Sequence, residues 1–464
     1  MNQLRPVSRR SARVAWLCLS LAAVFLMLPL CASLADDWPQ WLGANRDSVW
    51  RETGIVDRFP SEGLPIKWRA PVALGYSGPA VANGRVYLMD YVLRSGKVIN
   101  NADGRDRLEG SERVLCLDAG TGRLIWKHEY DRPYHISYPG PRCTPTIDGD
   151  RVYALGAEGN LSCLDAASGR PIWSKDFVKD FGARTPFWGV AAHPLVHGNT
   201  LYCVVGGKGS VAVAFDKRTG TELWRALSAS EPGYCPPTLI EHAGREQLLI
   251  WHAESLNSLD PQTGKVFWTV PLKPHGGMAI AAPRKLGPYL LATADGEVGA
   301  LLKLTDTPPA AEVVWRGQAK TAVYCCNSTP FLEDQMIYGC DARSGALMGV
   351  RLEDGERLWQ TFAPTIGGTR RAQYGTAFLV KHESRFFLFS ETGDLILAQL
   401  SSQGYEEINR FHVLEPTNHS FGRPVIWSHP AFAQRCLFAR NDKELVCVDL
   451  QESKATTKTN ASRK

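Results

Sequence analysis

Two adjacent cysteines, Cys325 and Cys326, are the sharpest chemical feature of the sequence. A neighbouring pair of thiols can close into a strained ring disulfide. The alternative is a pair of separate thiols whose side chains point to opposite sides of an extended segment. The sequence contains no HExxH, Gly-x-Ser-x-Gly, P-loop or CxxCH pattern, and its histidines are scattered singly. It therefore predicts no metal site, and it does not allow a catalytic residue to be assigned.

Several short segments combine aromatic residues with Arg, His and Asn. Side chains of these types around one opening would suit a small polar ligand or a peptide. Alternatively, they fill a channel and satisfy the ends of strands. The candidate ligand-binding residues are Tyr138, Arg142, Trp188, Tyr234, His275, Cys325, Cys326, Asn327, Arg371, Tyr374, His419 and Arg423.

A repeat that ends in tryptophan positions these segments. It reads LCLDAGTGRLIW at 115–126 and returns three more times with little change. Its Asp can accept N–H groups of the turn, its Gly suits the left-handed backbone, and its Trp can pack on the neighbouring unit. The repeat residues are Asp118, Gly122, Trp126, Asp165, Gly169, Trp173, Asp216, Gly220, Trp224, Asp260, Gly264 and Trp268, with Trp315 and Trp359 from weaker copies.

The number and spacing of the repeats predict a closed ring. Successive Trp positions lie 44 to 58 residues apart, with Phe411 replacing Trp in one copy, and this spacing fits four short strands per unit. The last copy, at 445–450, lacks a Trp strand, which is found instead around Trp68. We therefore expect an all-β, eight-bladed β-propeller of four-stranded antiparallel blades, closed by an N-terminal strand. An open solenoid would leave Trp68 unexplained.

The two ends of the chain predict export. Residues 1–35 have a basic start, an apolar stretch and a small-x-small site ending at Ala35, as in a signal peptide. An uncleaved membrane anchor, the twin-arginine route (Arg9-Arg10) and lipidation at Cys31 are less favoured alternatives. We expect an extension at 36–66, the propeller at 67–450 and a disordered polar tail at 451–464. The predicted location is the periplasm or cell envelope, and a monomer is expected.

The distribution of charge along the chain limits the classes of partner that we expect. The net charge of +5 lies largely at the chain ends, and no basic stripe crosses the body of the chain, which argues against nucleic acid as a partner.

Cys116, Cys163 and Cys447 share one repeat position, so packing is expected there rather than a disulfide framework. The charged link at 90–113 is expected to be a solvated loop, with partner docking as the alternative.

The repeat resembles the tryptophan-docking motif of pyrroloquinoline quinone (PQQ) dehydrogenase propellers. It is similar also to the PQQ-like propellers without cofactor, including the outer-membrane protein assembly propeller. DWPQWLGANRDS at 37–48 resembles the start of exported planctomycete-type PQQ-like propellers, although Leu42, Ala44 and Ser48 depart from it. The resemblance spans 38–450. It implies that the turns lie on one face and the candidate site on the other.

The resemblance leaves two function classes open. Quinoprotein dehydrogenases place a ring disulfide against the quinone and hold calcium with Glu, Asn and Asp, a set that this sequence does not allow us to assign. We expect a non-catalytic propeller scaffold of the envelope that binds a protein, peptide or small ligand at its loop face. The alternative is a PQQ-dependent dehydrogenase, with PQQ and calcium, that oxidises an alcohol or sugar. A purely structural envelope protein is a third class.

Overall fold

The computed structural model describes residues 36–452 of the chain, which belong to one compact unit that begins at Asp36. The predictions of a signal peptide at 1–35, of the twin-arginine route and of lipidation at Cys31 lie outside the described residues. The predicted polar tail lies outside them from residue 453 onward. Its first two residues are described: Gln451 bridges to Ile55, and the amide of Glu452 donates to Gly54 O at 2.9 Å.

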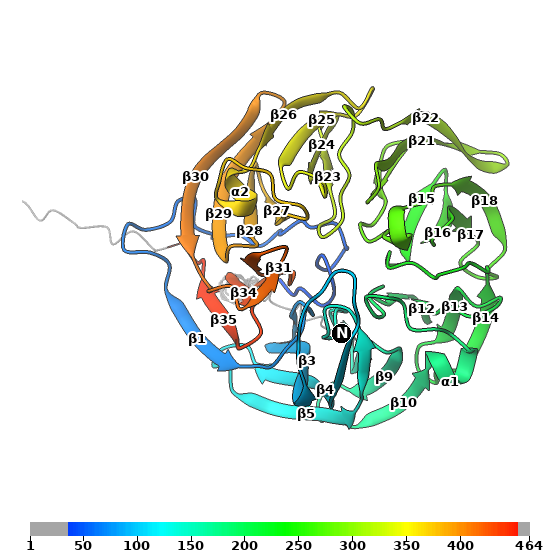
Figure 1. The fold of residues 1–464 in the computed structure, drawn as a ribbon, viewed down its shortest axis with the longest axis horizontal. Helices are drawn as coiled ribbons and strands as arrows, with labels where there is room; N and C mark the ends of the chain where they lie inside the picture. The colour runs from blue at the N-terminus through cyan, green and yellow to red at the C-terminus, as the bar shows by residue number, and fades with distance from the viewer. Residues whose placement is uncertain (1–35, 453–464) are drawn as a thin grey trace, which may run out of the picture. The chain divides into compact units, whose positions relative to one another are not determined.

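Eight antiparallel sheets stand around a central axis, and the predicted eight-bladed propeller is confirmed (Figure 1). From the inner to the outer strand, blades 1 to 4 are β2 (Ala80–Ala82), β3 (Arg85–Gly96), β4 (Asp106–Asp118) and β5 (Leu124–Asp131), with β6 (Tyr134–Ile136) paired to β4; β7 (Thr146–Asp148), β8 (Arg151–Leu155), β9 (Asn160–Asp165) and β10 (Pro171–Asp176); β11 (Leu195–His197), β12 (Thr200–Val204), β13 (Ala212–Asp216) and β14 (Glu222–Ala226); β15 (Thr238–His242), β16 (Arg245–Trp251), β17 (Ser255–Leu259) and β18 (Val266–Pro271).

The second half of the ring has the same order. Blades 5 to 8 are β19 (Arg284–Leu286), β20 (Tyr289–Ala294), β21 (Val298–Asp306) and β22 (Pro309–Arg316); β23 (Phe331–Glu333), β24 (Met336–Cys340), β25 (Leu347–Arg351) and β26 (Arg357–Thr361); β27 (Ala377–His382), β28 (Arg385–Ser390), β29 (Asp394–Ser401) and β30 (Gly404–His412); β33 (Ala431–Ala433), β34 (Cys436–Arg440), β35 (Glu444–Asp449) and β1 (Ile66–Pro71). A separate hairpin precedes blade 8, formed by β31 (Asn418–Ser420) and β32 (Arg423–Val425).

Among the described residues, helical structure is confined to short connections: α1 (Phe177–Phe181), α2 (Ala363–Ile366) and the 3-10 turn at His275–Gly277. Within residues 36–452, no helix has the length and apolar character needed to cross a membrane.

The tryptophan repeat joins neighbouring blades as the sequence predicts. Asp118 Oδ1 accepts the amide of Thr121 at 2.9 Å, and Gly122 takes a φ of +70°. A Cβ added to Gly122 would lie 2.6 Å from the ring of Trp68, so the glycine is needed for close approach as well as for the turn. Trp68 Nε1 donates to Ala119 O at 2.8 Å, and Trp126 makes the same contact with Ala166 O of the next blade at 3.0 Å.

Blade 5 departs from the repeat because a plain hairpin connects β21 to β22. Trp268 therefore has no repeat turn to dock on, and its Nε1 donates to Gln247 Oε1 of its own blade at 2.9 Å. In the position of the missing tryptophan of blade 7, Phe411 packs against Gly63, where an added Cβ would lie 2.7 Å from the ring.

Both ends of the chain build blade 8. Strand β1 pairs antiparallel with β35, so that Trp68 lies opposite Cys447. The amide of Asp449 donates to Pro65 O at 2.8 Å, which reproduces the bond between Asp118 and Arg123 in blade 1. The turn that the last repeat lacks is thus supplied by the segment before β1, as the unpaired Trp68 predicts.

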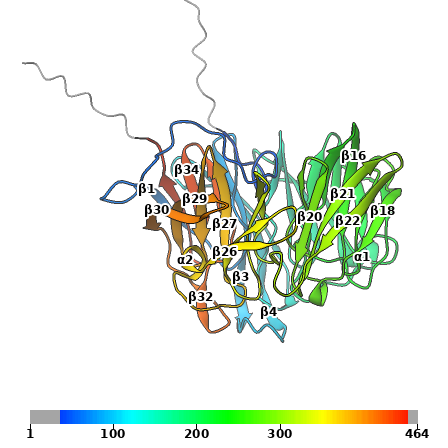
Figure 2. The same cartoon turned by 90° about the horizontal axis from the view of Figure 1, so that it is seen from above.

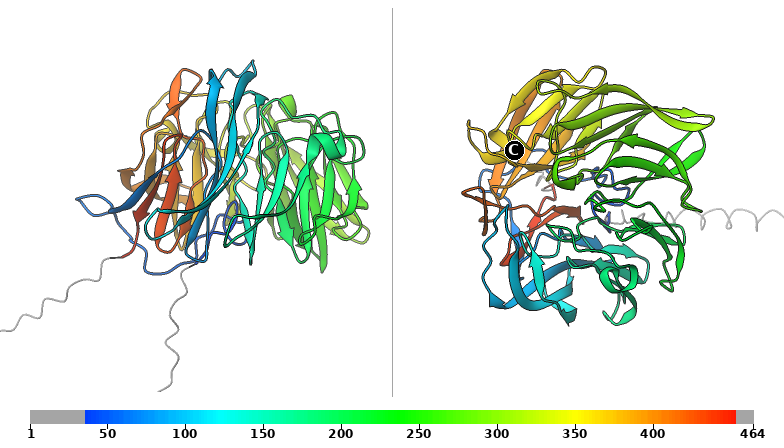
Figure 3. Two further views of the ribbon diagram at one scale, coloured as in Figure 1. Left: turned by 90° about the horizontal axis from the view of Figure 1, so that it is seen from below. Right: turned by 45° about the vertical axis from the view of Figure 1, so that its right-hand side comes forward.

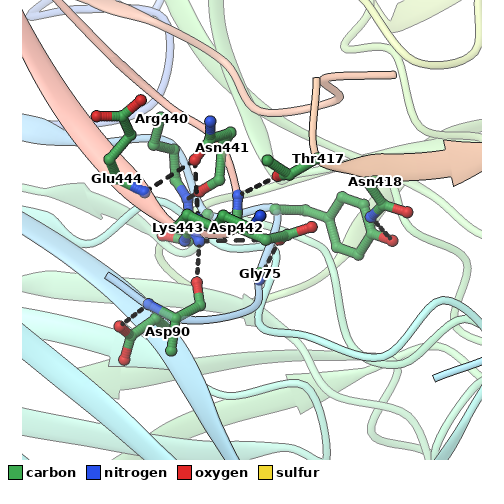
Figure 4. A network of polar contacts seen from close by, with 12 residues as sticks. Gly75, Asp90, Thr417, Asn418, Arg440, Asn441, Asp442, Lys443 and Glu444 are labelled. Carbon is green, nitrogen blue, oxygen red and sulfur yellow. Dashed lines mark hydrogen bonds and ion pairs between the residues drawn. The ribbon is translucent and has the colours of Figure 1, made fainter. Parts of the chain in front are cut away.

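A buried polar network locks blade 8 to blade 1 (Figure 4). Arg440 is fully buried; its Nη1 donates to Met89 O at 3.0 Å and its Nη2 to Ala73 O. Asp442 accepts the amide of Gly75 at 2.9 Å and lies 4.0 Å from the Arg440 guanidinium. Since Ala73 and Gly75 follow β1 directly, the network holds the point where the ring closes.

The charged link at 90–113 is mostly strand, contrary to the expectation of a solvated loop. β3 and β4 continue through it, paired from Arg85–Asp118 to Gly96–Leu108. Tyr91 and Leu108 are buried with Tyr134, because β6 covers the extended hairpin. Only residues 97–105 remain between the two strands.

The two faces of the ring differ. The extended hairpin β3–β4 and the hairpin β31–β32 project from one face, which we call the loop face (Figure 2). The segment at 38–50 lies at the opposite face (Figure 3).

Candidate functional site

A cavity of about 770 Å³ opens at the loop face, within the range of small-ligand sites. It is lined by residues from the segments between blades, as the fold requires. Of the candidates predicted from the sequence, the structure brings together Tyr138, Arg142, Trp188, Tyr234, His275, Cys326, Asn327 and Tyr374. Lining residues that were not among the candidates include Tyr76, Asp103, Phe187, His193, Glu231, Met278, Gln373, Phe421, Trp427 and His429.

The N-terminal extension closes the cavity from below. Trp38 bridges to Val81 of blade 1, the amide of Ile147 in blade 2 donates to Pro39 O at 2.8 Å, and Val49 bridges to Lys381 of blade 7. Between these points, Arg46 Nη1 donates to Pro194 O beside blade 3 and Arg46 O accepts Arg284 Nη1 of blade 5, so residues 38–50 cross the channel (Figure 1). The cavity is therefore a cup with one open end.

Two histidines form the floor of the cup. The Trp41 ring stacks on His193 with ring centroids 4.7 Å apart and meets His429 edge-on at 5.7 Å. Burial lowers the pKa of His429 to about 3, and burial with the neighbouring His429 and Arg46 lowers the pKa of His193 well below its usual value. Both imidazoles are consequently neutral at physiological pH.

One arginine lines the cup and two lie below its floor. Arg142 lines the cup and donates to Gly140 O at 2.9 Å and Tyr138 O at 2.7 Å, while its guanidinium lies 4.9 Å from the centre of the Tyr76 ring. Below the floor, Arg46 donates to Pro194 O and Arg284 donates to Arg46 O, each at 2.9 Å. Burial lowers the pKa of both Arg46 and Arg284 to about 10.

Aromatic rings form the walls. Trp188 and Tyr234 meet edge-to-face with centroids 5.7 Å apart, and Tyr138 lies 5.8 Å from Trp427. Trp427 is fixed by its Nε1, which donates to buried Glu391 at 2.9 Å. Apolar faces with few rotatable bonds favour a flat or apolar ligand body.

Two segments narrow the mouth. Asn100 Nδ2 of the 97–105 loop donates to Asn418 Oδ1 of the β31–β32 hairpin at 2.5 Å, and Asn418 Nδ2 donates to Tyr76 Oη at 2.6 Å. Phe421 at the tip of the hairpin is 43% exposed and lies 5.2 Å from the ring of Tyr374. Asp103 and Glu231 bring acidic groups to the lining of the cavity.

Four predicted candidates lie outside the cavity. Arg371 and His419 are exposed. Arg423 does not line the cup; its Nε donates to Glu391 at 2.7 Å and so holds the β31–β32 hairpin. Cys325 is buried in the core shared by blades 5 and 6.

The adjacent cysteines are separate thiols. Cys326 packs with Tyr234, Met278 and Ala342 beside the cup, whereas Cys325 points into the blade core, where an added Cβ at Gly339 would lie 2.6 Å from its Sγ. Burial raises the pKa of both thiols. All ten cysteines from Cys116 to Cys447 are free and buried. Within residues 36–452, no three His, Cys, Asp or Glu side chains are grouped so that they could hold a metal ion.

A sequence signal for the floor exists, although the candidate residues do not include it. His193 and His429 each directly precede the proline that opens an inner region of their blade, Pro194 and Pro430. The corresponding positions elsewhere hold residues such as Gly78, Thr144 and Thr329. Comparison of this one repeat position would have identified both histidines.

Three kinds of comparison place the chain among known proteins. The family model described as outer membrane protein assembly factor BamB matches residues 110–361 and 252–464. No curated protein matches the chain in sequence. Among solved structures, it is similar to quinohemoprotein alcohol dehydrogenase from Comamonas testosteroni, with a TM-score of 0.55 and 13% identity over 90% of this chain and 81% of that one.

Two further solved structures are similar. A quinohemoprotein alcohol dehydrogenase from Pseudomonas putida HK5 has a TM-score of 0.53 and 13% identity over 92% of this chain and 82% of that one. BamB from Moraxella catarrhalis has a TM-score of 0.39 and 15% identity over 84% of this chain and 98% of that one. Identities this low, with TM-scores above 0.5 for the two dehydrogenases, indicate a shared fold and not a shared activity.

Proposed function

The chain belongs to the propeller family described as outer membrane protein assembly factor BamB, and on that premise we propose that it is an exported, non-catalytic propeller scaffold. It binds a protein, peptide or small ligand of the cell envelope in the cup on its loop face. The observation that carries this proposal is the one-ended cavity, closed by residues 38–50 and lined with aromatic and hydrogen-bonding side chains. A plug that merely fills the channel would leave no space of this size.

Two features support binding rather than redox catalysis. Within residues 36–452, no three His, Cys, Asp or Glu side chains are grouped so that they could hold the calcium that accompanies PQQ. Cys325 and Cys326 are separate thiols on different sides of their segment. The dehydrogenase remains the second candidate because the fold is shared with quinohemoprotein alcohol dehydrogenases.

A titration with PQQ and calcium separates the two candidates. We expect purified protein to show no stoichiometric quinone binding and no dye-linked oxidation of alcohols or sugars. Tight stoichiometric binding with turnover would overturn the scaffold proposal.

Binding at the cup is tested by affinity capture from the envelope fraction of the native host. A component retained by the wild type should be lost with the W188A/Y374A variant, and retained by L223A, which changes an exposed residue of the outer strand β14. Equal retention by all three proteins would show that the cup is not the binding site.

A further inference from the structure

The hydrogen bond that His193 accepts determines which of its nitrogens carries the proton. Its Nδ1 accepts the amide of Thr144 at 2.9 Å, and burial keeps the ring neutral. A neutral imidazole has a single N–H, which must then be at Nε2. In the described part of the chain this Nε2–H has no acceptor, and His193 lines the cup while only 7% exposed. The floor therefore presents an unused hydrogen-bond donor.

Arg142 adds further unused donors. Its three hydrogen bonds go to the carbonyls of Gly140, Ser137 and Tyr138 and use one hydrogen of Nη1 and both of Nη2. A guanidinium has five N–H groups, so Nε–H and one Nη1–H are free of protein acceptors among residues 36–452. The rest of the group is held rigidly, which suits it to receive a ligand oxygen.

Among the described residues, none of the three arginines has a carboxylate bound to it, although the charge of Asp47 acts on Arg284. Arg46 and Arg142 donate to carbonyl oxygens, and Arg284 donates to carbonyl oxygens and to Ser48 Oγ. In residues 36–452 none of the three forms an ion pair with a carboxylate. Burial accordingly lowers the pKa of all three guanidinium groups. A negative charge in the cup would be attracted by Arg142 in its lining and by Arg46 and Arg284 below its floor, all three of which are half-buried.

The acidic residues of the cavity disfavour a ligand that carries more than one carboxylate. Asp103 is exposed at the mouth and Glu231 is half-buried, so a ligand with several carboxylates would place some of them beside these side chains. Between floor and mouth, the Trp188, Tyr234 and Trp427 rings provide flat apolar surface.

We propose that the cup binds a ligand with one carboxylate and a flat, apolar body, with the carboxylate against Arg142 and His193. The inference rests on the proposed function, which makes the cup the binding site. The same chemistry occurs in a free aromatic acid and in a polypeptide that ends in an aromatic residue. His429, the second floor imidazole, has no protein hydrogen-bond partner in the described residues and can donate to the same carboxylate.

Calorimetric titration with matched probes tests the proposal. The free-acid series is 3-phenylpropionate, its amide, the corresponding amine and phenylsuccinate; the peptide series is a pentapeptide ending in Phe with a free or an amidated carboxyl end. We expect the acid to bind about tenfold or more tightly than its amide in at least one series, since a charged acceptor strengthens such hydrogen bonds. The series with the tighter acid identifies the source of the carboxylate. Weaker binding of phenylsuccinate than of phenylpropionate is expected as well.

Variants locate the carboxylate. Arg142→Gln should reduce acid binding to the level of the amide, and Arg371→Gln, which changes an exposed arginine outside the cup, should leave it unchanged. If Arg142→Gln does not fold, His429→Phe keeps an aromatic ring without its N–H and should weaken the acid several-fold while leaving the amide unaffected.

Three results would overturn the proposal: equal affinity for acid and amide, tighter binding of the amine, or no binding of any probe at millimolar concentration. None of these results would contradict the proposed function, because capture of an envelope component by the wild type and its loss with W188A/Y374A do not depend on the charge of the ligand.

Discussion

Trp41 lies face to face on His193, with ring centroids 4.7 Å apart and ring planes 12° apart. One residue comes from the extension before the propeller and the other from the connection into blade 3. Their contact turns an open channel into a cup, and it makes the extension a part of the site rather than a leader to the fold.

Removing the Trp41 ring should therefore destabilise the protein. Trp41 is 4% exposed, so Trp41→Ala leaves a cavity under both floor histidines. We expect a loss of about 3–5 kcal/mol in the free energy of unfolding, measured by urea denaturation. Leu223→Ala, at a side chain 53% exposed on the outer strand, should change it by less than about 0.5 kcal/mol. Similar losses in both variants would show that the ring is not packed as described.

The floor histidines predict a loss of stability in acid. Their pKa values are lowered in the folded protein, to about 3 for His429, whereas unfolded histidine titrates near 6.5. Between these pH values the unfolded chain binds more protons, so stability is complete above about pH 6.5 and falls as the pH decreases toward 3. Each histidine contributes a slope of up to about 1.4 kcal/mol per pH unit.

The His429→Gln variant isolates this contribution. Urea unfolding at pH 7 and pH 5 should show a smaller difference for the variant than for the wild type, because one of the two titrating groups is gone. An unchanged difference would mean that His429 is not held neutral in the folded state.

Glycine at the docking turn is predicted to be required for two separate reasons. Gly122→Ala forces a side chain into φ +70° and places its Cβ 2.6 Å from the Trp68 ring. Gly149→Ala meets only the backbone strain, since the φ of Gly149 is +58° and no atom lies within 4 Å of an added Cβ. We expect about 1 kcal/mol of destabilisation for Gly149→Ala and clearly more for Gly122→Ala, measured as unfolding midpoints. Equal effects would exclude the close approach of Trp68.

The network at the ring closure predicts a coupled pair (Figure 4). Arg440→Met leaves the carbonyls of Ala73 and Met89 without their donor and Asp442 without its neighbouring cation. We expect a loss of about 3–5 kcal/mol in unfolding free energy. Adding Asp442→Asn to this variant should recover part of it, because the buried charge is then removed; strictly additive effects would contradict the coupling.

The thiols give a simpler prediction. Because the ten cysteines from Cys116 to Cys447 are buried, a thiol reagent should label none of them in the native protein and all ten in urea. Rapid native labelling would contradict this burial, most directly at Cys326, which lines the cup but is only 3% exposed.

The fold could be read from the sequence because the repeat carries its own geometry. The Asp–Gly–Trp spacing sets the turn and the docking ring, and the unmatched Trp68 predicts that β1 closes blade 8. The link at 90–113 was assigned wrongly as a solvated loop, because its many charges hid the alternation that buries Tyr91 and Leu108. Charged side chains can occupy the solvent-facing positions of a strand without preventing the strand from forming.

The site was less accessible to sequence reasoning. Aromatic and charged residues in the connections between blades identify much of the wall of the cup. Which residues form its floor depends on where the N-terminal extension crosses the channel. His193 and His429 become a floor only through Trp41, which is distant in sequence from both. Similarly, Arg423 resembles a ligand-binding residue in the sequence, yet its partner is Glu391, and it serves to hold the hairpin.

The shared eighth blade has a consequence for the order of assembly. β1 is among the first strands to be synthesised, and its partner β35 is the last. Until β35 is available, Trp68 has no strand beside it, and the backbone edge of β1 is open to wrong partners. Completion of the ring must therefore wait for the whole chain, at the entropic cost of a contact between its two ends. A chain truncated before β35 would lose a blade and also an anchor of the segment that leads to the cup floor, so an incomplete product would lack the closed cup.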